Sequence, residues 1–253
     1  MFEKSKNLEI RSTSLDEDSI SSKLRNFHTE HLESFGEGWN QHSLITMQRQ
    51  TISRILYYDM LYRKIVGVPG CILEFGVQWG GTLAQLIALR GIYEPYHYTR
   101  HIYGFDTFEG FASSDQTLDG AHLTDGDYLV TKGYEAKLEE VLLLHEANCP
   151  LNHIKKFTLI KGDASDTAQE WADTNLHAVV AMAIFDMDIY KPTKDCLELI
   201  SSRLTKGSVI GFDELNDPDS PGETTALMET FGLRNISLKR YKYASRVSYF
   251  VVE

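Results

Sequence analysis

The sequence predicts an α/β fold: a doubly wound, mostly parallel sheet of seven strands, preceded by an N-terminal helical extension. From Cys71 onward, short apolar runs alternate with amphipathic stretches, a pattern typical of parallel strands covered by helices on both faces. The length of 253 residues suits one large domain of this class better than two independent ones. We therefore expect an arm and helical extension over residues 1–66 and the sheet domain over residues 67–253.

The region before the sheet divides into two parts. Up to about Gly38 the chain is polar and acidic with few apolar residues, which predicts a mobile arm or a loosely docked helix. From Ser43 to Ile65, apolar residues recur four positions apart at Ile52, Leu56 and Met60, which predicts a helix that ends before Pro69. The apolar face of this helix predicts a homo-oligomer.

The sheet and its helices can be assigned along the rest of the chain. The predicted strands are Cys71–Phe75, His101–Phe105, Phe157–Lys161, Val179–Phe185, Ser208–Phe212 and Val247–Val252, with Ser237–Tyr241 as the seventh. The predicted helices are Thr82–Arg90, Tyr134–Asn148, Ala164–Thr174, Thr193–Leu204 and Thr224–Phe231. The last two strands can pair antiparallel.

Composition excludes several classes of function. The net charge of −11 disfavours a nucleic-acid partner, because binding to phosphates depends on Lys and Arg. Cys71, Cys149 and Cys196 are too far apart for a disulfide framework or a zinc motif. The N-terminus is polar, and no apolar run is long enough to cross a bilayer. We expect a cytoplasmic protein with no membrane partner.

In doubly wound sheets, ligands bind beyond the carboxyl ends of the strands. The first predicted strand has Glu74 next to its last residue and is followed by Gly76 and Gly80, where backbone can approach a ligand closely. The turn lacks the G-x-G-x-x-G pattern, which argues against an NAD-dependent oxidoreductase and fits a positively charged ligand better than a pyrophosphate. Taken alone, the glycines could equally serve a tight turn.

The next two strands also end in acidic residues. Asp106 follows the second strand, where a carboxylate can accept hydrogen bonds from ribose hydroxyls, and Gly162 and Asp163 follow the third. Asp163 could face the adenine side of the same pocket. Either aspartate could instead be a helix N-cap. Three consecutive strands ending in acid and glycine favour a binding site.

Four more carboxylates follow the fourth and fifth strands: Asp186 and Asp188, and then Asp213 and Glu214. Acids that share one cleft repel one another unless a cation lies among them, and hard oxygen ligands select Mg²⁺ or a similar ion. The alternative is a group of solvated loop acids and helix caps.

Together, the motifs Glu74-Phe75-Gly76-Val77, Gly104 to Gly110, Asp186 to Tyr190 followed by Thr193, and Asp213-Glu214 resemble the macrocin O-methyltransferase family, and most closely its deoxysugar-methylating relatives. The match runs from about Val68 to Phe231. The resemblance implies a class I methyltransferase domain over residues 67–253, S-adenosylmethionine as cofactor, and Mg²⁺. The family usually has two aspartates where this chain has Asp213 and Glu214.

This resemblance and the strand-end pattern together define the expected site. The expected cofactor residues are Glu74, Gly76, Gly80, Asp106, Thr107, Phe108, Gly162, Asp163 and Asp186. The expected metal ligands are Asp186, Asp213 and Glu214. Asp186 or Asp188 would take the proton of the acceptor hydroxyl, with His122, in the polar stretch 119–128, as another possible base.

The resemblance implies a sugar hydroxyl as the methyl acceptor. Two alternatives stay open at this point. A catechol-type O-methyltransferase would share the cofactor and metal sites and differ in its acceptor pocket. A non-catalytic binding or scaffold protein could keep the same fold, because fold alone does not imply function.

Overall fold

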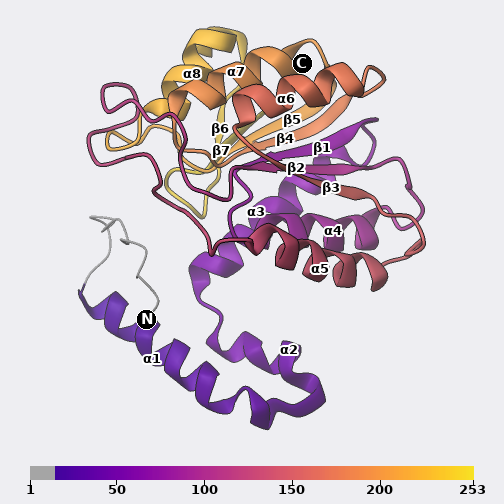
Figure 1. Ribbon diagram of the computed structural model, residues 1–253, viewed down its shortest axis with the longest axis vertical. Coiled ribbons are helices and arrows are strands. Elements are labelled where there is room, and N and C mark those ends of the chain that lie inside the picture. The colour runs from indigo at the N-terminus through magenta and orange to yellow at the C-terminus, as the bar shows by residue number, and fades with distance from the viewer. Residues whose placement is uncertain (1–14) are drawn as a thin grey trace. The chain divides into compact units, whose positions relative to one another are not determined.

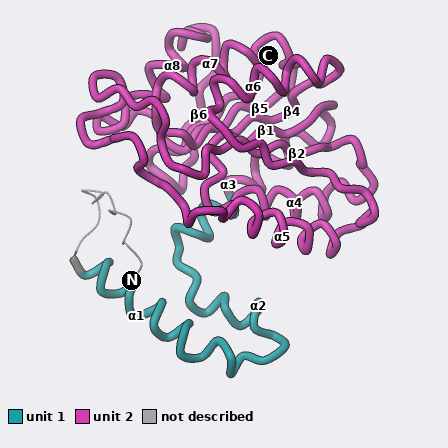
Figure 2. Tube along the Cα trace, viewed as in Figure 1, with its two compact units in different colours: residues 1–56 teal, residues 57–253 magenta. Residues whose placement is uncertain are grey.

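The computed structural model describes residues 15–253 (Figure 1). The described chain divides after Leu56 into two compact units, the second of which is Tyr57–Glu253 (Figure 2). The part of the predicted arm before residue 15 lies outside the described residues. The sheet and all the strand-end acids belong to the second unit.

The first unit is helical. It contains α1 (Leu15–His31), the 3₁₀ helix η1 (Glu33–Gly38), α2 (Trp39–His42), the 3₁₀ helix η2 (Ser43–Thr46) and the start of α3 (Arg49–Ile65). The prediction of one helix over Ser43–Ile65 is therefore wrong at its start. The Ser43 hydroxyl donates to Trp39 O at 2.6 Å and the Thr46 hydroxyl to Ser43 O at 3.0 Å, and such side-chain bonds to nearby carbonyls compete with a continuous helix.

The second unit contains the predicted seven-stranded sheet, in the order β3-β2-β1-β4-β5-β7-β6. The pairs among β1 to β5 are parallel, and β7 runs antiparallel to both β5 and β6. This confirms the predicted fold class. The strands are β1 (Cys71–Phe75), β2 (Ile102–Asp106), β3 (Phe157–Lys161), β4 (Val180–Phe185), β5 (Leu204–Phe212), β6 (Lys239–Arg240) and β7 (Ser248–Val251).

Helices cover both faces of the sheet, as Figure 1 shows: α4 and α5 on one face, and α6, α7 and α8 on the other. Residues that alternate along β1 divide between two apolar clusters, with Ile72 in the cluster of α4 and α5 and Leu73 in the cluster of α6 to α8. The helices are α4 (Gly81–Tyr93), α5 (Tyr134–Ala147), α6 (Ala164–Thr174), α7 (Tyr190–Ser201) and α8 (Gly222–Phe231), with the 3₁₀ helix η3 at Leu233–Asn235.

Two boundaries differ from the prediction because distant residues set them. Helix α7 begins at Tyr190 rather than Thr193, and the Tyr190 N–H donates to the Asp119 carboxylate from a loop 71 residues away in the chain. Strand β5 begins at Leu204 rather than Ser208, because Leu204 pairs with Val180 across an irregularity in the β4–β5 register. Neither contact can be read from local periodicity.

The stability of the sheet domain should depend on pH through His101. Burial, together with the Arg90 charge, lowers the pKa of His101 from 6.5 to about 4. Since the unfolded chain binds this proton at a pH where the folded chain does not, the free energy of unfolding falls as pH drops from about 7 toward 4. We expect wild type to lose about 1–2 kcal/mol more than His101→Gln between pH 7.5 and pH 5 in urea unfolding. Equal losses in the two proteins would contradict this assignment.

Candidate active site

The acid-bearing turns are joined side by side along one edge of the sheet. Beyond the strand pairs, the Gly162 N–H donates to Asp106 O at 2.9 Å and the Gly76 N–H donates to Phe105 O at 3.0 Å. Likewise, Asp186 N–H donates to Phe75 O at 2.9 Å, and Asp213 N–H donates to Phe185 O at 3.1 Å. Neighbouring strands are spaced about 4.8 Å apart, so these turns form one continuous edge.

Gly76 is required where the turns after β1 and β4 meet. Its φ is +93°, and a Cβ at this position would lie 1.9 Å from the carbonyl oxygen of Asp186. Any side chain would therefore push the two turns apart. The glycine brings the backbone of the expected cofactor turn into direct contact with the first residue of the acid cluster.

Asp106 links the turns after β1 and β2. One carboxylate oxygen accepts the Gln78 N–H at 2.7 Å, and the other accepts the Phe108 N–H at 2.5 Å. Burial raises the pKa of Asp106, and these backbone donors oppose the rise. The side chain is partly exposed, and each carboxylate oxygen has a second lone pair. Asp106 is therefore held in place while it can still accept hydrogen bonds from ribose hydroxyls.

Two more of the expected cofactor residues have their side chains engaged within the protein. The Thr107 hydroxyl donates to Gly110 O at 2.6 Å and accepts the Glu109 N–H at 3.1 Å. Phe108 is buried in the apolar core on the α4 and α5 side. These residues shape the loop after β2, and any contact with the cofactor would come from their backbone.

The other expected cofactor residues lie at the same sheet edge. Glu74 is only 1% exposed, so it lies beneath the surface of the turn. Gly80 packs against the Leu138 side chain, which approaches it too closely for a Cβ. Asp163 caps α6 by accepting the Ser165 N–H at 2.9 Å, which is the alternative role weighed from the sequence. Capping leaves its second carboxylate oxygen available to a ligand.

The acids after β4 and β5 interact with one another. Burial raises the pKa of Asp188 well above its usual value, and the charges of Glu214, Asp186 and Asp213 raise it further. Burial also raises the pKa of Glu214 to about 7; Arg246 opposes this rise and Asp213 adds to it. The structure therefore places the four predicted acids in one electrostatic cluster, in which their full ionisation is costly without a cation.

Arg246 contributes a positive charge to this acid cluster. It was not predicted from the sequence as a residue of the site. Its guanidinium forms an ion pair with Glu214 and another with Asp217 at 3.1 Å. Arg246 lies just before β7, and its carbonyl accepts the Leu215 N–H at 2.9 Å. No sequence motif connects it with the turn after β5, because the antiparallel return of β7 brings the two together.

The loop between β2 and α5 contributes residues other than the one predicted. His122 is exposed on this loop. Three residues earlier, Asp119 is buried and accepts the Tyr190 N–H at 2.5 Å. Burial raises the pKa of Tyr128, and the charges of Asp188 and Glu214 raise it further, so this phenol lies near the acid cluster. The polar loop was a visible signal, but nothing in it singled out Asp119 or Tyr128.

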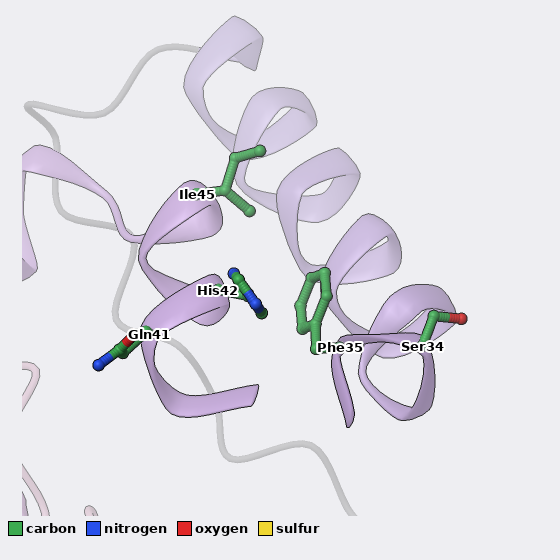
Figure 3. A pocket seen from close by; sticks show the side chains of 5 residues that line it. All are labelled: Ser34, Phe35, Gln41, His42 and Ile45. Carbon is green, nitrogen blue, oxygen red and sulfur yellow. The ribbon is translucent and has the colours of Figure 1, made fainter. Parts of the chain in front are cut away.

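Within residues 15–253, no three His, Cys, Asp or Glu side chains form a ready-made metal site. The structure also contains an open hollow of about 520 Å³ lined by Ser34, Phe35, Gln41, His42 and Ile45 (Figure 3). Its lining belongs entirely to the first unit and includes none of the strand-end acids. No helix in the described part of the chain is both long and apolar enough to span a bilayer.

Comparison with known proteins shows the family of the chain. The family described as Macrocin-O-methyltransferase (TylF) matches residues 18–226. The chain belongs to the macrocin O-methyltransferase family. It is accordingly an S-adenosylmethionine-dependent O-methyltransferase, and the resemblance stated from the sequence is confirmed. Among curated proteins, no sequence matches the chain.

Among solved structures, this macrocin-type methyltransferase is similar to an enzyme of calicheamicin biosynthesis. CalS11, a calicheamicin methyltransferase, is 35% identical with a TM-score of 0.87, and the match covers 94% of this chain and 93% of CalS11. A second structure, apo CalS11 described as a TDP-rhamnose 3'-O-methyltransferase, is 34% identical with a TM-score of 0.83 and coverages of 94% and 95%. The O-methyltransferase NovP shares the fold at 16% identity, with a TM-score of 0.60 and coverages of 79% and 80%.

Proposed function

We propose that this methyltransferase transfers the methyl group of S-adenosylmethionine to a sugar hydroxyl with the help of a divalent cation such as Mg²⁺. The acceptor would be a deoxysugar, a nucleotide sugar or a glycosylated natural product. The name of CalS11 as a TDP-rhamnose 3'-O-methyltransferase supports the sugar class, because that enzyme matches nearly the whole chain at 34% identity. The family assignment supports the same class.

The observation that carries the proposal is the cluster of acids at one sheet edge. Asp186, Asp188, Asp213 and Glu214 are all partly exposed, and burial together with the charges of neighbouring acids raises the pKa values of Asp188 and Glu214. Arg246 forms an ion pair with Glu214 and opposes the rise in the pKa of that carboxyl. Burial and the neighbouring acids nevertheless raise this pKa to about 7. A divalent ion would relieve this repulsion, and carboxylate oxygens are the ligands that Mg²⁺ prefers.

In this proposal Asp186, Asp213 and Glu214 would hold the ion. When bound, a divalent ion orients neighbouring sugar oxygens and lowers the pKa of a hydroxyl. Asp186 and Asp213 begin adjacent turns, whereas Glu214 would have to share its carboxylate between the ion and Arg246. The three carboxylates are chemically suited to bind Mg²⁺. Glu214 is the ligand for which the ion would have to compete with Arg246.

The remaining residues would bind and orient the two substrates. Asp106, held by two backbone donors, would accept hydrogen bonds from the ribose of the methyl donor. Asp188 would accept the proton of the acceptor hydroxyl as that oxygen forms its bond to the methyl carbon and the bond from carbon to sulfur breaks. Holding the hydroxyl in line with the methyl group supplies much of the rate.

An acceptor panel tests the substrate class. We expect methyl transfer, followed by mass spectrometry, to at least one deoxysugar nucleotide or glycosylated acceptor and none to catechol. Transfer to catechol alone would replace this proposal with the catechol-type alternative. Binding of S-adenosylmethionine without transfer to any acceptor would favour the scaffold alternative.

Asp213→Asn tests the metal assignment. This change removes one charge from the cluster and keeps the shape, so we expect the calorimetric affinity for Mg²⁺ to fall by about tenfold or more. Asp173→Asn, an exposed site on α6, should bind Mg²⁺ as wild type does. If Asp213→Asn bound Mg²⁺ unchanged, the ligand assignment would be wrong.

We also propose that the protein is a cytoplasmic homo-oligomer. Its three cysteines are free thiols, in keeping with a reducing compartment. The first unit exposes several large apolar side chains, including Trp39 and Ile45. Burying such a surface against another copy would remove it from water. Light scattering of the purified protein measures the mass directly, and a monomer would contradict the oligomer.

A further inference from the structure

Glu223 is a buried carboxyl group next to the acid cluster, although it belongs to no strand-end turn. It lies in the first turn of α8 and is 0% exposed. Its Oε1 accepts the Met187 N–H at 3.1 Å and the Asp188 N–H at 3.3 Å. Two consecutive backbone groups of the turn after β4 are therefore held by this one side-chain oxygen.

The turn that Glu223 holds has an uncommon conformation. Asp188 has a φ of +61°, in the left-handed region that residues with a side chain rarely adopt. Such conformations persist where surrounding contacts fix them, and they concentrate at functional sites. Without Oε1, the buried N–H of Met187 would lose the acceptor that the structure gives it.

The helix that carries Glu223 packs directly on the same turn. A Cβ on Gly222 would lie 2.6 Å from Asp188 O and 2.7 Å from Tyr190 N, so backbone meets backbone here without an intervening side chain. Figure 1 shows α8 beside α7, which begins at Tyr190. The start of α8 therefore fixes both the distance and the orientation of the turn that carries Asp188.

We propose that Glu223 is a positioning residue that holds the Asp188 carboxylate in the orientation needed to take the acceptor's proton. The inference rests on the proposed function, which assigns that proton to Asp188. It predicts that kcat depends on a side-chain oxygen at position 223 that can accept hydrogen bonds and lies as far from the backbone as that of glutamate. A negative charge at this position is not required.

Two conservative variants separate reach from charge. Glu223→Gln keeps an oxygen at the same reach but has no group that can ionise, and Glu223→Asp keeps the carboxyl group on a shorter side chain. We expect kcat to fall by less than about threefold in Glu223→Gln and by about tenfold or more in Glu223→Asp. The affinity for S-adenosylmethionine, measured by calorimetry, should stay within twofold of wild type in both.

A double mutant ties the effect to Asp188. If Glu223 acts through that carboxylate, adding Glu223→Asp to Asp188→Asn should lower kcat by less than about threefold further. The inference is overturned if Glu223→Asp keeps wild-type kcat, if Glu223→Gln loses as much as Glu223→Asp, or if the two changes multiply in the double mutant. A wild-type kcat in Asp188→Asn alone would instead refute the assignment of the proton to Asp188, on which this inference rests, and would leave the acceptor class to the acceptor panel.

Discussion

Asp188→Asn is expected to lower kcat by about 10²–10⁴-fold, the usual contribution of a positioned general base. Asparagine nearly matches the shape of aspartate but cannot take the proton of the acceptor hydroxyl. The Asp188 backbone N–H would still donate to Glu223, so the turn should keep its conformation. Single-turnover methyl transfer with saturating S-adenosylmethionine measures the chemical step directly.

The control for this experiment is the exposed Asp173→Asn on α6, which should keep wild-type kcat. Calorimetry should also show that Asp188→Asn binds S-adenosylmethionine within about twofold of wild type, because the expected ribose-binding acid is Asp106. A kcat within threefold of wild type in Asp188→Asn would rule out this residue as the base and would bring Asp186 or His122 forward.

Arg100→Met is expected to destabilise the sheet domain by about 3–5 kcal/mol, the cost of breaking a buried ion pair. The Arg100 side chain is 0% exposed, and its Nε and Nη2 donate to the two oxygens of Glu94 at 2.8 Å each. The guanidinium also donates to three backbone carbonyls between the end of α3 and the start of β1, those of Ile65, Val68 and Gly70. Methionine fills similar space but leaves Glu94 buried without its cation.

Arg63→Met provides a matched comparison on an exposed ion pair. Arg63 pairs with Asp59 at 2.7 Å on the surface of α3, with 59% of its side chain exposed, so its loss should cost about 1 kcal/mol or less. Urea unfolding followed by far-UV circular dichroism measures both variants. Equal destabilisation by the two changes would show that the buried network has no special role in holding α3 to the sheet.

The sheet could be predicted well because its signals are local. Parallel strands covered on both faces are continuous apolar runs, and β1 (Cys71–Phe75) and β3 (Phe157–Lys161) were predicted to the residue. The glycine and acid turns followed from the rule that ligands bind at the carboxyl ends of strands. The prediction was weaker where distant residues decide a boundary, as Asp119 does at the start of α7.

The same limit applies to the candidate site. Asp106 ends β2, and Asp186 and Asp213 directly follow β4 and β5, so their position in the chain shows where they lie. Glu223 and Arg246 reach the acid cluster from the start of α8 and from the segment before β7, and only the folded chain brings them there. A glutamate in the first turn of a helix is ordinary in sequence, and its burial is what makes it notable.

In the proposed function, the carboxylates at this sheet edge form one site for a methyl donor and a divalent cation. Crystals grown with S-adenosylhomocysteine and Mn²⁺ would test it directly through the anomalous signal of the metal. We expect one Mn²⁺ peak coordinated by Asp186 and Asp213, with the nucleoside ribose hydrogen-bonded to Asp106. A nucleoside bound without any metal at these acids, or a metal bound elsewhere, would contradict it.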